Sequence, residues 1–474
     1  MIPAGNAHRR RRPRPARRRA AALAWLIALA GLVGLARGAT PAPAQPPAVQ
    51  APPPAQPAAA QGPPAADSQP PLAPMTAMAP ISALTADQAV ALALEHNPTL
   101  LGQAAAIDST RAGEITAALR PNPTFTSGTN DFTSGVSWTI ERGGKRQRRI
   151  DSARLATAGA GLDYADARRT LVLNVRSTFT AALLAKSNLA LARENLKSFD
   201  QEEGLHRIRY EKGEISGADF LKISLQKLQF ETDVQDATLA LRTATTNLRQ
   251  LLYAPELAAD FEVLGELQAA PLERPLEQLQ ETAYRHRPDL RSAATALAKA
   301  EADVRLAQAN AHVDPNVALG WNHVGSSFGP TWLQPQFPKG AASNTLTSGF
   351  SIPLPVFDRN QGEIARTKAE VIRARSRVDV LRAQVGNDVE VAFASLQLSR
   401  ERVRLYEQTY LGQARNSRQI AEFAYRKGAT SILDLLEAER TDRGVQLAYR
   451  QALADYVTRL KQLEAAVGED VAAH

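Results

Sequence analysis

Residues 425–438 read YRKGATSILDLLEA, and residues 210–223 read YEKGEISGADFLKI. Both stretches place a Lys-Gly pair before a serine, with an aspartate three residues after that serine. Glycine commonly ends a helix in the left-handed conformation, and a serine followed three residues later by an acid commonly begins the next helix. Each stretch therefore predicts a tight turn at which one helix runs back along another.

Two further pairs of stretches indicate that the chain is an internal repeat. NPTL at 97–100 recurs as RPDL at 287–290, and GVSWTI at 135–140 recurs as GFSIPL at 349–354. Three matches in the same order are typical of a duplicated architecture. We predict the repeats at residues 81–265 and 266–474, with an insertion mostly around residues 326–343 that explains the wider spacing of the later matches.

Long helices are predicted in two tracts without proline, residues 124–254 and 356–474. Both tracts are rich in good helix formers, and Ile364, Val371, Val378 and Val385 are spaced by sevens, as in a coiled coil. The pattern over residues 148–209 alone predicts a helix about 90 Å long. Helices of that length exceed a globular domain and indicate an extended bundle.

Alternating apolar residues between the helical tracts predict two strands in each repeat. The alternation is clear in Val136, Trp138 and Ile140; in Val317, Leu319 and Trp321; and in Leu346, Phe350 and Ile352, whereas Phe125 and Phe132 mark a weaker partner. Soluble hairpins explain these segments as well as membrane strands do. If they lie in a membrane, four strands are too few to close a barrel, and the barrel must be shared between chains.

The net charge of +8 belongs to the N-terminus. Residues 1–44 carry nine arginines and no acid, with an apolar run at residues 20–36, which is the layout of a signal peptide cleaved before Gln45. The alternative is an uncleaved inner-membrane anchor. Residues 45–80, within a proline-rich stretch, are predicted to be a linker. Without residues 1–44 the chain has 47 basic and 48 acidic residues, so nucleic-acid binding loses its support.

Two motifs at strand-to-helix junctions point to a known family. ERGGKR at 141–146 and PLPVFDRNQG at 353–362, together with the repeated helices and strands, resemble the TolC family of outer-membrane efflux proteins, in its cation-efflux (CzcC-like) branch. The resemblance implies a mainly helical α+β fold in a homotrimer. Each chain would add four strands to a shared transmembrane β-barrel that continues into a long coiled-coil α-helical barrel in the periplasm. The chain has no cysteine, so no lipid-modified cysteine is expected.

The resemblance also implies the function. The chain would be the outer-membrane exit duct of a tripartite system that exports heavy-metal cations, working with a periplasmic adaptor protein and an inner-membrane pump of the resistance-nodulation-division type. A duct for drugs, organic solutes or type I secretion is the variant in the same class, and a periplasmic coiled-coil adaptor or a purely structural coiled coil are the alternatives from other classes. No enzyme activity, cofactor or metal site is expected, because the seven histidines form no ligand pair.

The helix turns carry the first group of candidate functional residues. Carried over by position from the family, Asp434 and Glu437 would form rings of carboxylates that narrow the periplasmic entrance, and Asp219 is their candidate companion. Helix capping alone is the alternative explanation for the aspartates. The turns are also candidate contacts for the adaptor, or else solvated tips without a partner; the residues concerned are Lys212, Gly213, Ser216, Lys427, Gly428 and Ser431.

The junctions between strands and helices carry the second group. Basic residues there either contact lipid phosphates of the outer membrane or simply begin a solvated helix. The candidate residues of the two junctions are Gly143, Gly144, Lys145 and Arg146 in the first repeat, and Asp358, Arg359 and Asn360 in the second.

Overall fold

The structure is a computed structural model that describes residues 81–128, 133–269, 274–324 and 343–471. The predicted signal peptide at 1–44, the linker at 45–80 and nearly all of the predicted insertion lie outside the described residues.

The described chain is mainly helical, as predicted. The predicted long helix at 148–209 lies within a single helix of 67 residues, about 100 Å long. The helices are α1 (Ala86–His96), α2 (Pro98–Ala118), α3 (Lys145–Glu211), α4 (Gly217–Leu252), α5 (Leu276–His286), α6 (Pro288–Asn310), α7 (Gln361–Leu405), α8 (Leu411–Arg426) and α9 (Ile432–Val467). Two helices, two strands and a long helical hairpin follow one another in each half, the order that the internal repeat predicts, and the repeat itself stays a prediction.

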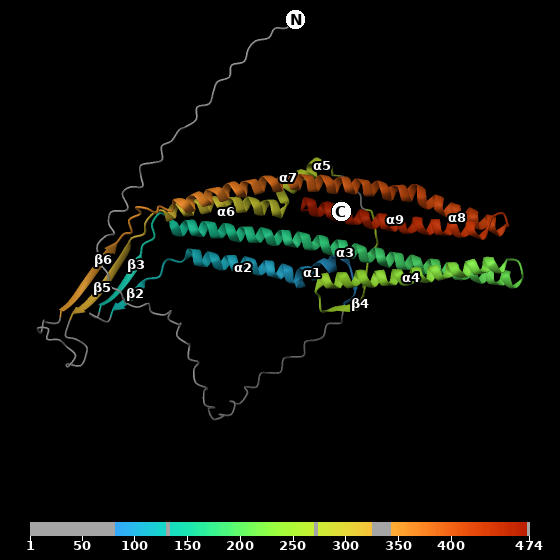
Figure 1. Ribbon diagram of the computed structural model, residues 1–474, viewed down its shortest axis with the longest axis horizontal. Coiled ribbons are helices and arrows are strands. Elements are labelled where there is room, and N and C mark those ends of the chain that lie inside the picture. Colours follow the sequence, from blue (N-terminus) through green and yellow to red (C-terminus); the bar gives the residue numbers. More distant parts are fainter. Residues whose placement is uncertain (1–80, 129–132, 270–273, 325–342, 472–474) are drawn as a thin grey trace, which may run out of the picture. The chain divides into compact units, whose positions relative to one another are not determined.

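The long helices run side by side, with α3 against α4 and α7 and α8 against α9 (Figure 1). One buried cluster joins α1, α3 and α4 around Val175 and Leu248, and another joins α5, α6, α7 and α9 around Val385 and Leu463. A third, smaller cluster lies near the helical turns and includes Phe230 of α4 and Ile432 of α9. This third cluster therefore packs the two hairpins against each other.

The four predicted strands form one antiparallel sheet at the end of the bundle opposite the helical turns (Figure 1). They are β2 (Thr124–Gly128), β3 (Thr133–Thr139), β5 (Asn316–Val324) and β6 (Ser343–Ser351), in the order β2-β3-β5-β6. Ile140 and Ile352 lie one residue beyond their strands, and Phe132 lies outside the described residues. Within this chain β2 and β6 are the edges of the sheet.

Two features were not predicted. A parallel pair joins β1 (Ile81–Leu84) to β4 (Leu257–Val263), with Leu84 and Val263 both buried. A π-helical turn at Tyr406–Tyr410 separates α7 from α8, where an uninterrupted helix was expected. Over the described residues, none of the helices combines the length and the apolarity that crossing a membrane requires.

Candidate functional site

The sheet has one strongly apolar face. Val136 lies opposite both Phe125 and Leu319, and Val317 lies opposite both Trp138 and Phe350. Directly opposed residues point to the same side of a sheet, as do residues two apart along a strand. The apolar side chains of this face are those of Phe125, Val136, Trp138, Val317, Leu319, Trp321, Leu346 and Phe350, with the small polar Ser127, Ser134 and Ser348 among them. Six of the eight apolar side chains are exposed, and Leu346 reaches 78% exposure.

The opposite face of the sheet is small and polar. It carries Thr126, Gly135, Ser137, Ala318, Gly320, Thr347 and Gly349. The four strands contain no lysine, arginine, aspartate or glutamate at all. A sheet with an apolar face, an uncharged polar face and no core packed against the apolar one has the pattern of membrane-spanning strands, with lipid outside and water inside.

The first strand-to-helix junction is held by an ion pair that the sequence did not reveal. The Lys145 side chain is only 10% exposed, and its Nζ lies 2.7 Å from Oδ2 of Asp314. The other carboxylate oxygen of Asp314 accepts a hydrogen bond from the Arg142 backbone N–H at 2.9 Å. Lys145 therefore fixes the start of α3 to the segment before β5 and does not offer a free charge to solvent.

Neighbouring basic residues of this junction also have partners within the chain. Arg149 pairs with Glu141, which raises the pKa of that guanidinium, and Arg146 donates to the Ala118 carbonyl oxygen. Gly143 has a φ of 69°, and a Cβ there would lie 2.7 Å from the His312 ring. Contact between this cluster and lipid phosphates stays a prediction.

The second strand-to-helix junction has a similar backbone geometry. Asn360 has a φ of 59° and precedes the first residue of α7, as Gly144, with a φ of 69°, precedes that of α3. The Asn360 side-chain amide donates to the Ala307 carbonyl oxygen at 2.7 Å, which links α7 to α6. Asp358 accepts from the Asn360 backbone N–H at 2.8 Å, and the Arg359 N–H donates to the Gln361 side chain at 2.7 Å.

The two helical turns have the same backbone geometry. Gly213 and Gly428 have φ values of 74° and 70°, and each backbone N–H donates to a tyrosine carbonyl oxygen three residues earlier at 2.9 Å. The next N–H, that of Glu214 or Ala429, reaches back five residues, which completes a Schellman motif. Lys212 and Lys427 are the C-caps of α3 and α8. The predicted turns are confirmed in both halves.

The residue that follows each turn caps the next helix. Ser216 accepts from the Asp219 N–H at 3.1 Å, and Ser431 accepts from the Asp434 N–H at 3.3 Å. Hydrogen bonds from Ser216 and Lys222 lower the pKa of Asp219. Asp434 also accepts from the Ser431 N–H at 3.0 Å, which completes a capping box.

Glu437 lies one turn further along α9 and behaves differently. Its side chain is exposed, and it makes no hydrogen bond or ion pair with any other described side chain. The structure therefore shows that capping engages Asp219 and Asp434 but leaves Glu437 free. Asp434 and Glu437 lie together on the first turns of α9, whereas Asp219 lies on α4 of the other hairpin.

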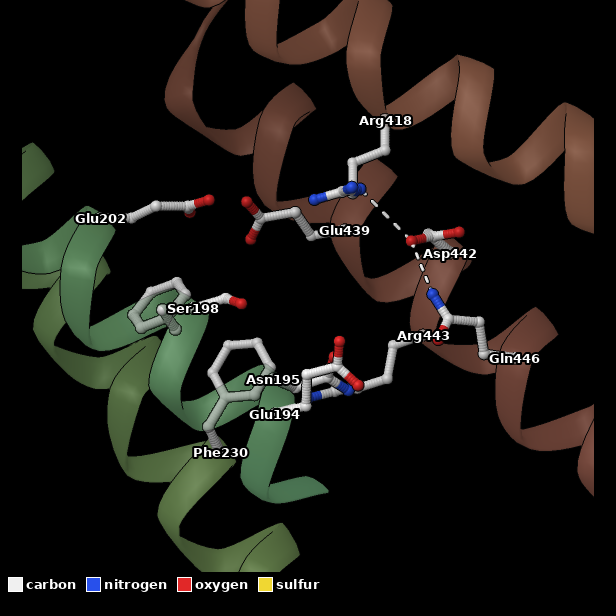
Figure 2. Close-up of a pocket in the computed structure, with 11 residues that line it drawn as sticks. Glu194, Asn195, Ser198, Glu202, Phe230, Arg418, Glu439, Asp442, Arg443 and Gln446 are labelled. Carbon is white, nitrogen blue, oxygen red and sulfur yellow. Dashed lines mark hydrogen bonds and ion pairs between the residues drawn. The ribbon is translucent and has the colours of Figure 1, made fainter. Parts of the chain in front are cut away.

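A cavity of about 150 Å³ lies between the two hairpins, behind the turns (Figure 2). Glu202 of α3 and Glu439 of α9 point toward each other across it. Burial and the neighbouring Glu202 carboxylate raise the pKa of Glu439 to about 8, and burial also raises the pKa of Glu202. This pair could not be predicted from the sequence, because no short-range pattern connects residues in different halves of a chain.

Known proteins of similar sequence and structure agree on what kind of protein this is. Over 381 residues the chain is 26% identical to the cobalt-zinc-cadmium resistance protein CzcC of Cupriavidus metallidurans, covering 77% of this chain and 87% of that protein. It is also 26% identical to the pyoverdine export outer membrane protein OpmQ of Pseudomonas putida, over 67% of this chain and 65% of that one. The solved structure of CusC, described in terms of transmembrane channel formation, matches with a TM-score of 0.66 and 19% identity, over 81% of this chain and 92% of CusC.

A family sequence profile, that of the outer membrane efflux proteins, matches most of the chain. The matched residues are 89–252 and 279–469, close to the two halves that the internal repeat predicts. Among the described residues, no group of three or more histidine, aspartate or glutamate side chains is arranged to hold a metal ion. The sheet with its apolar face, the long helical hairpins and the matched profile lead to one conclusion: this chain belongs to the outer membrane efflux protein family, whose members are transport channels of the Gram-negative outer membrane and not enzymes.

Proposed function

We propose that this chain is the exit duct of a tripartite efflux system, that three copies form it, and that heavy-metal cations are its cargo. The observation that carries the proposal is the four-stranded sheet with one exposed apolar face and two unpaired edges. The long hairpins then extend the duct away from the membrane.

The open edges of the sheet supply the reason for several copies. In lipid, the unpaired N–H and C=O groups of β2 and β6 would have no partners, which costs several kcal/mol for each group. Pairing β6 of one copy with β2 of the next satisfies both edges. Four strands from each of three copies give twelve, which exceeds the eight strands of the smallest natural barrels.

Two observations support metal cations as the cargo. CzcC, whose name is that of a cobalt-zinc-cadmium resistance protein, matches over most of both chains. The exposed Glu437 carboxylate would occur three times in a trimer, next to Asp434, and a ring of carboxylates at an entrance favours cations over anions. Similarity to a pyoverdine exporter supports an organic solute as the second candidate cargo.

The cargo is tested by deleting the gene in the source bacterium and measuring growth inhibition by Co²⁺, Zn²⁺ and Cd²⁺, alongside a panel of organic compounds. We expect the deletion to lower metal tolerance several-fold, with recovery when the intact gene is returned. Unchanged metal tolerance together with greater sensitivity to organic compounds would assign the duct to the second candidate.

The helical turns are the proposed contact with a periplasmic adaptor protein. Cysteines for crosslinking belong at Glu214 and Ala429, because both are exposed and the adjacent glycines cannot change without strain at positive φ. A cysteine at the exposed Arg111 of α2 is the control, far along the bundle. We expect adaptor crosslinks from the two turn positions only. A product from the control position alone would reject these turns as the contact.

A further inference from the structure

The cavity of Figure 2 lies at the seam between the two helical hairpins. Its lining comes from α3 and α4 of one hairpin and from α8 and α9 of the other. The π-helical turn at Tyr406–Tyr410 ends just before α8, and such turns are natural points of bending in a helix. The seam therefore lies between the π-helical turn and the tip of the α8–α9 hairpin.

Two acidic side chains meet at this seam without a basic partner between them. Glu202 and Glu439 are half-buried and point toward each other across the cavity (Figure 2), so a proton on Glu439 can be shared with Glu202. Two ionised carboxylates that face each other in a half-buried site would repel each other. The contact therefore holds only while one of the two carboxyl groups is protonated.

The charged groups around the pair are mostly bound to other residues. The facing groups are Glu194 on α3; Arg418, Glu422 and Arg426 on α8; and Asp442 and Arg443 on α9, whereas α4 contributes the Phe230 ring. Arg418 Nε lies 3.3 Å from Asp442 Oδ2, and Arg443 Nη1 lies 2.7 Å from Asp233 Oδ2. At longer range the positive charge of Arg418 lowers the pKa of Glu439, whereas the negative charge of Glu422 raises it.

We propose that Glu202 and Glu439 form a proton-dependent latch that holds the tip of the α8–α9 hairpin against α3. While the pair keeps its shared proton, the hydrogen bond joins the two hairpins. When the proton leaves, the two carboxylates repel and the seam opens around the cavity. The Arg443–Asp233 ion pair and the hydrogen bond from Arg450 Nε to Ser187 Oγ, which do not depend on this proton, keep the rest of the seam closed.

The direction of the pH response follows from the raised pKa of Glu439. Its value of about 8 lies above the ordinary value of 4.5, so the docked state binds the proton more tightly than the separated state. The contribution of the latch is complete below about pH 4.5 and is lost as the pH rises through about 8. The seam is therefore closed in acidic and neutral surroundings and opens in alkaline ones.

Spin labels on the full-length protein in detergent test the latch directly. The chain has no cysteine, so cysteines introduced at Leu205 of α3 and Ile420 of α8, both exposed, are labelled without background. Double electron–electron resonance then measures the distance between them from about pH 6 to about pH 9.5. Labelled chain is diluted with unlabelled chain so that each pair lies within one copy, and EDTA removes divalent cations that would otherwise bind the carboxylates.

We expect one short distance at the acidic end and a second, longer population that grows with a midpoint near pH 8. In Glu439→Gln the amide still donates to Glu202 and cannot ionise, so the short distance should persist at every pH. In Glu202→Gln the amide can donate to ionised Glu439 and no second carboxylate repels it, so the short distance should again persist at every pH. Glu231→Gln on α4, an exposed glutamate, is the matched control and should behave as the unaltered chain.

Three results would overturn the latch: a distance that does not depend on pH in the unaltered chain, an unchanged pH response in Glu439→Gln, or an unchanged pH response in Glu202→Gln. The second variant decides the matter if the first fails to fold. The measurement does not depend on transport, so a pH-dependent distance in a protein that conducts no ions would support the latch and reject the proposed duct.

Discussion

Replacing Asp314 by alanine should strongly destabilise the strand-to-helix junction, although Asp314 lies in the short segment before β5. Asp314 forms an ion pair with Lys145 at 2.7 Å, and the two side chains are only 23% and 10% exposed. It also accepts the Arg142 N–H at 2.9 Å. The substitution therefore removes two contacts at once and leaves the Lys145 ammonium in a nearly dry site.

The magnitude follows from the burial of Lys145. Removing one partner of a fully buried ion pair costs about 3–5 kcal/mol, mainly because the other charge loses its compensation. Asp314 keeps some contact with water, so the cost should fall at or just below the bottom of that range, at about 2–3 kcal/mol. The lost hydrogen bond from Arg142 adds about 0.5–1 kcal/mol. The expected total is about 3 kcal/mol.

The assay is thermal or urea unfolding in detergent, followed by tryptophan fluorescence, since Trp138 of β3 is close to this junction. Asp108→Ala is the matched control, because it breaks an exposed pair with Arg111 and should cost at most about 1 kcal/mol. Adding Lys145→Met to Asp314→Ala should recover much of the loss, since no charge stays buried. A loss equal to that of the control, or no recovery in the double variant, would refute this reasoning.

Three further predictions concern the tip and the sheet. Asp434→Ala should cost about 1 kcal/mol of stability through loss of the capping box. Glu437→Ala should leave stability unchanged but reduce cation selectivity in planar bilayers. Unchanged conductance and cation selectivity in the double variant would reject a gate at these residues. Leu346→Arg should prevent stable assembly in the outer membrane, whereas Thr347→Ser on the opposite face should assemble normally, as judged by membrane fractionation; equal assembly of both would contradict the assignment of the faces. Gly428→Ala should destabilise the second turn by about 1 kcal/mol, because alanine is strained at a φ of 70°, and limited proteolysis of the turn should increase.

The local parts of the fold could be predicted from the sequence, because they depend on short-range patterns. The lysine-glycine turns, the serine caps and the strand at Val317 to Trp321 follow from residues close together in the chain. The parallel pair of β1 and β4 was missed, although Phe261 and Val263 alternate with acids and could have indicated the second strand. The first strand, with only four residues, carries no usable period.

The candidate site was harder to predict, because its decisive contacts join distant residues. Lys145 read as a basic side chain at a helix start, and only the fold brings Asp314 to it. Glu202 and Glu439 each look like solvated acids on long helices, and their pairing depends on how the hairpins are set against each other. The π-helical turn likewise has no composition that marks it. Local sequence patterns determine the helices and strands, whereas tertiary packing determines which charged side chains contact one another.

The number of copies in the assembly tests the account most directly. Protein extracted from the outer membrane in mild detergent can be weighed by native mass spectrometry, in which the detergent is removed in the gas phase. We predict a mass of three chains, because only a shared barrel pairs the edges of β2 and β6. A single chain that is nevertheless inserted in the outer membrane would contradict the shared barrel and the duct built on it.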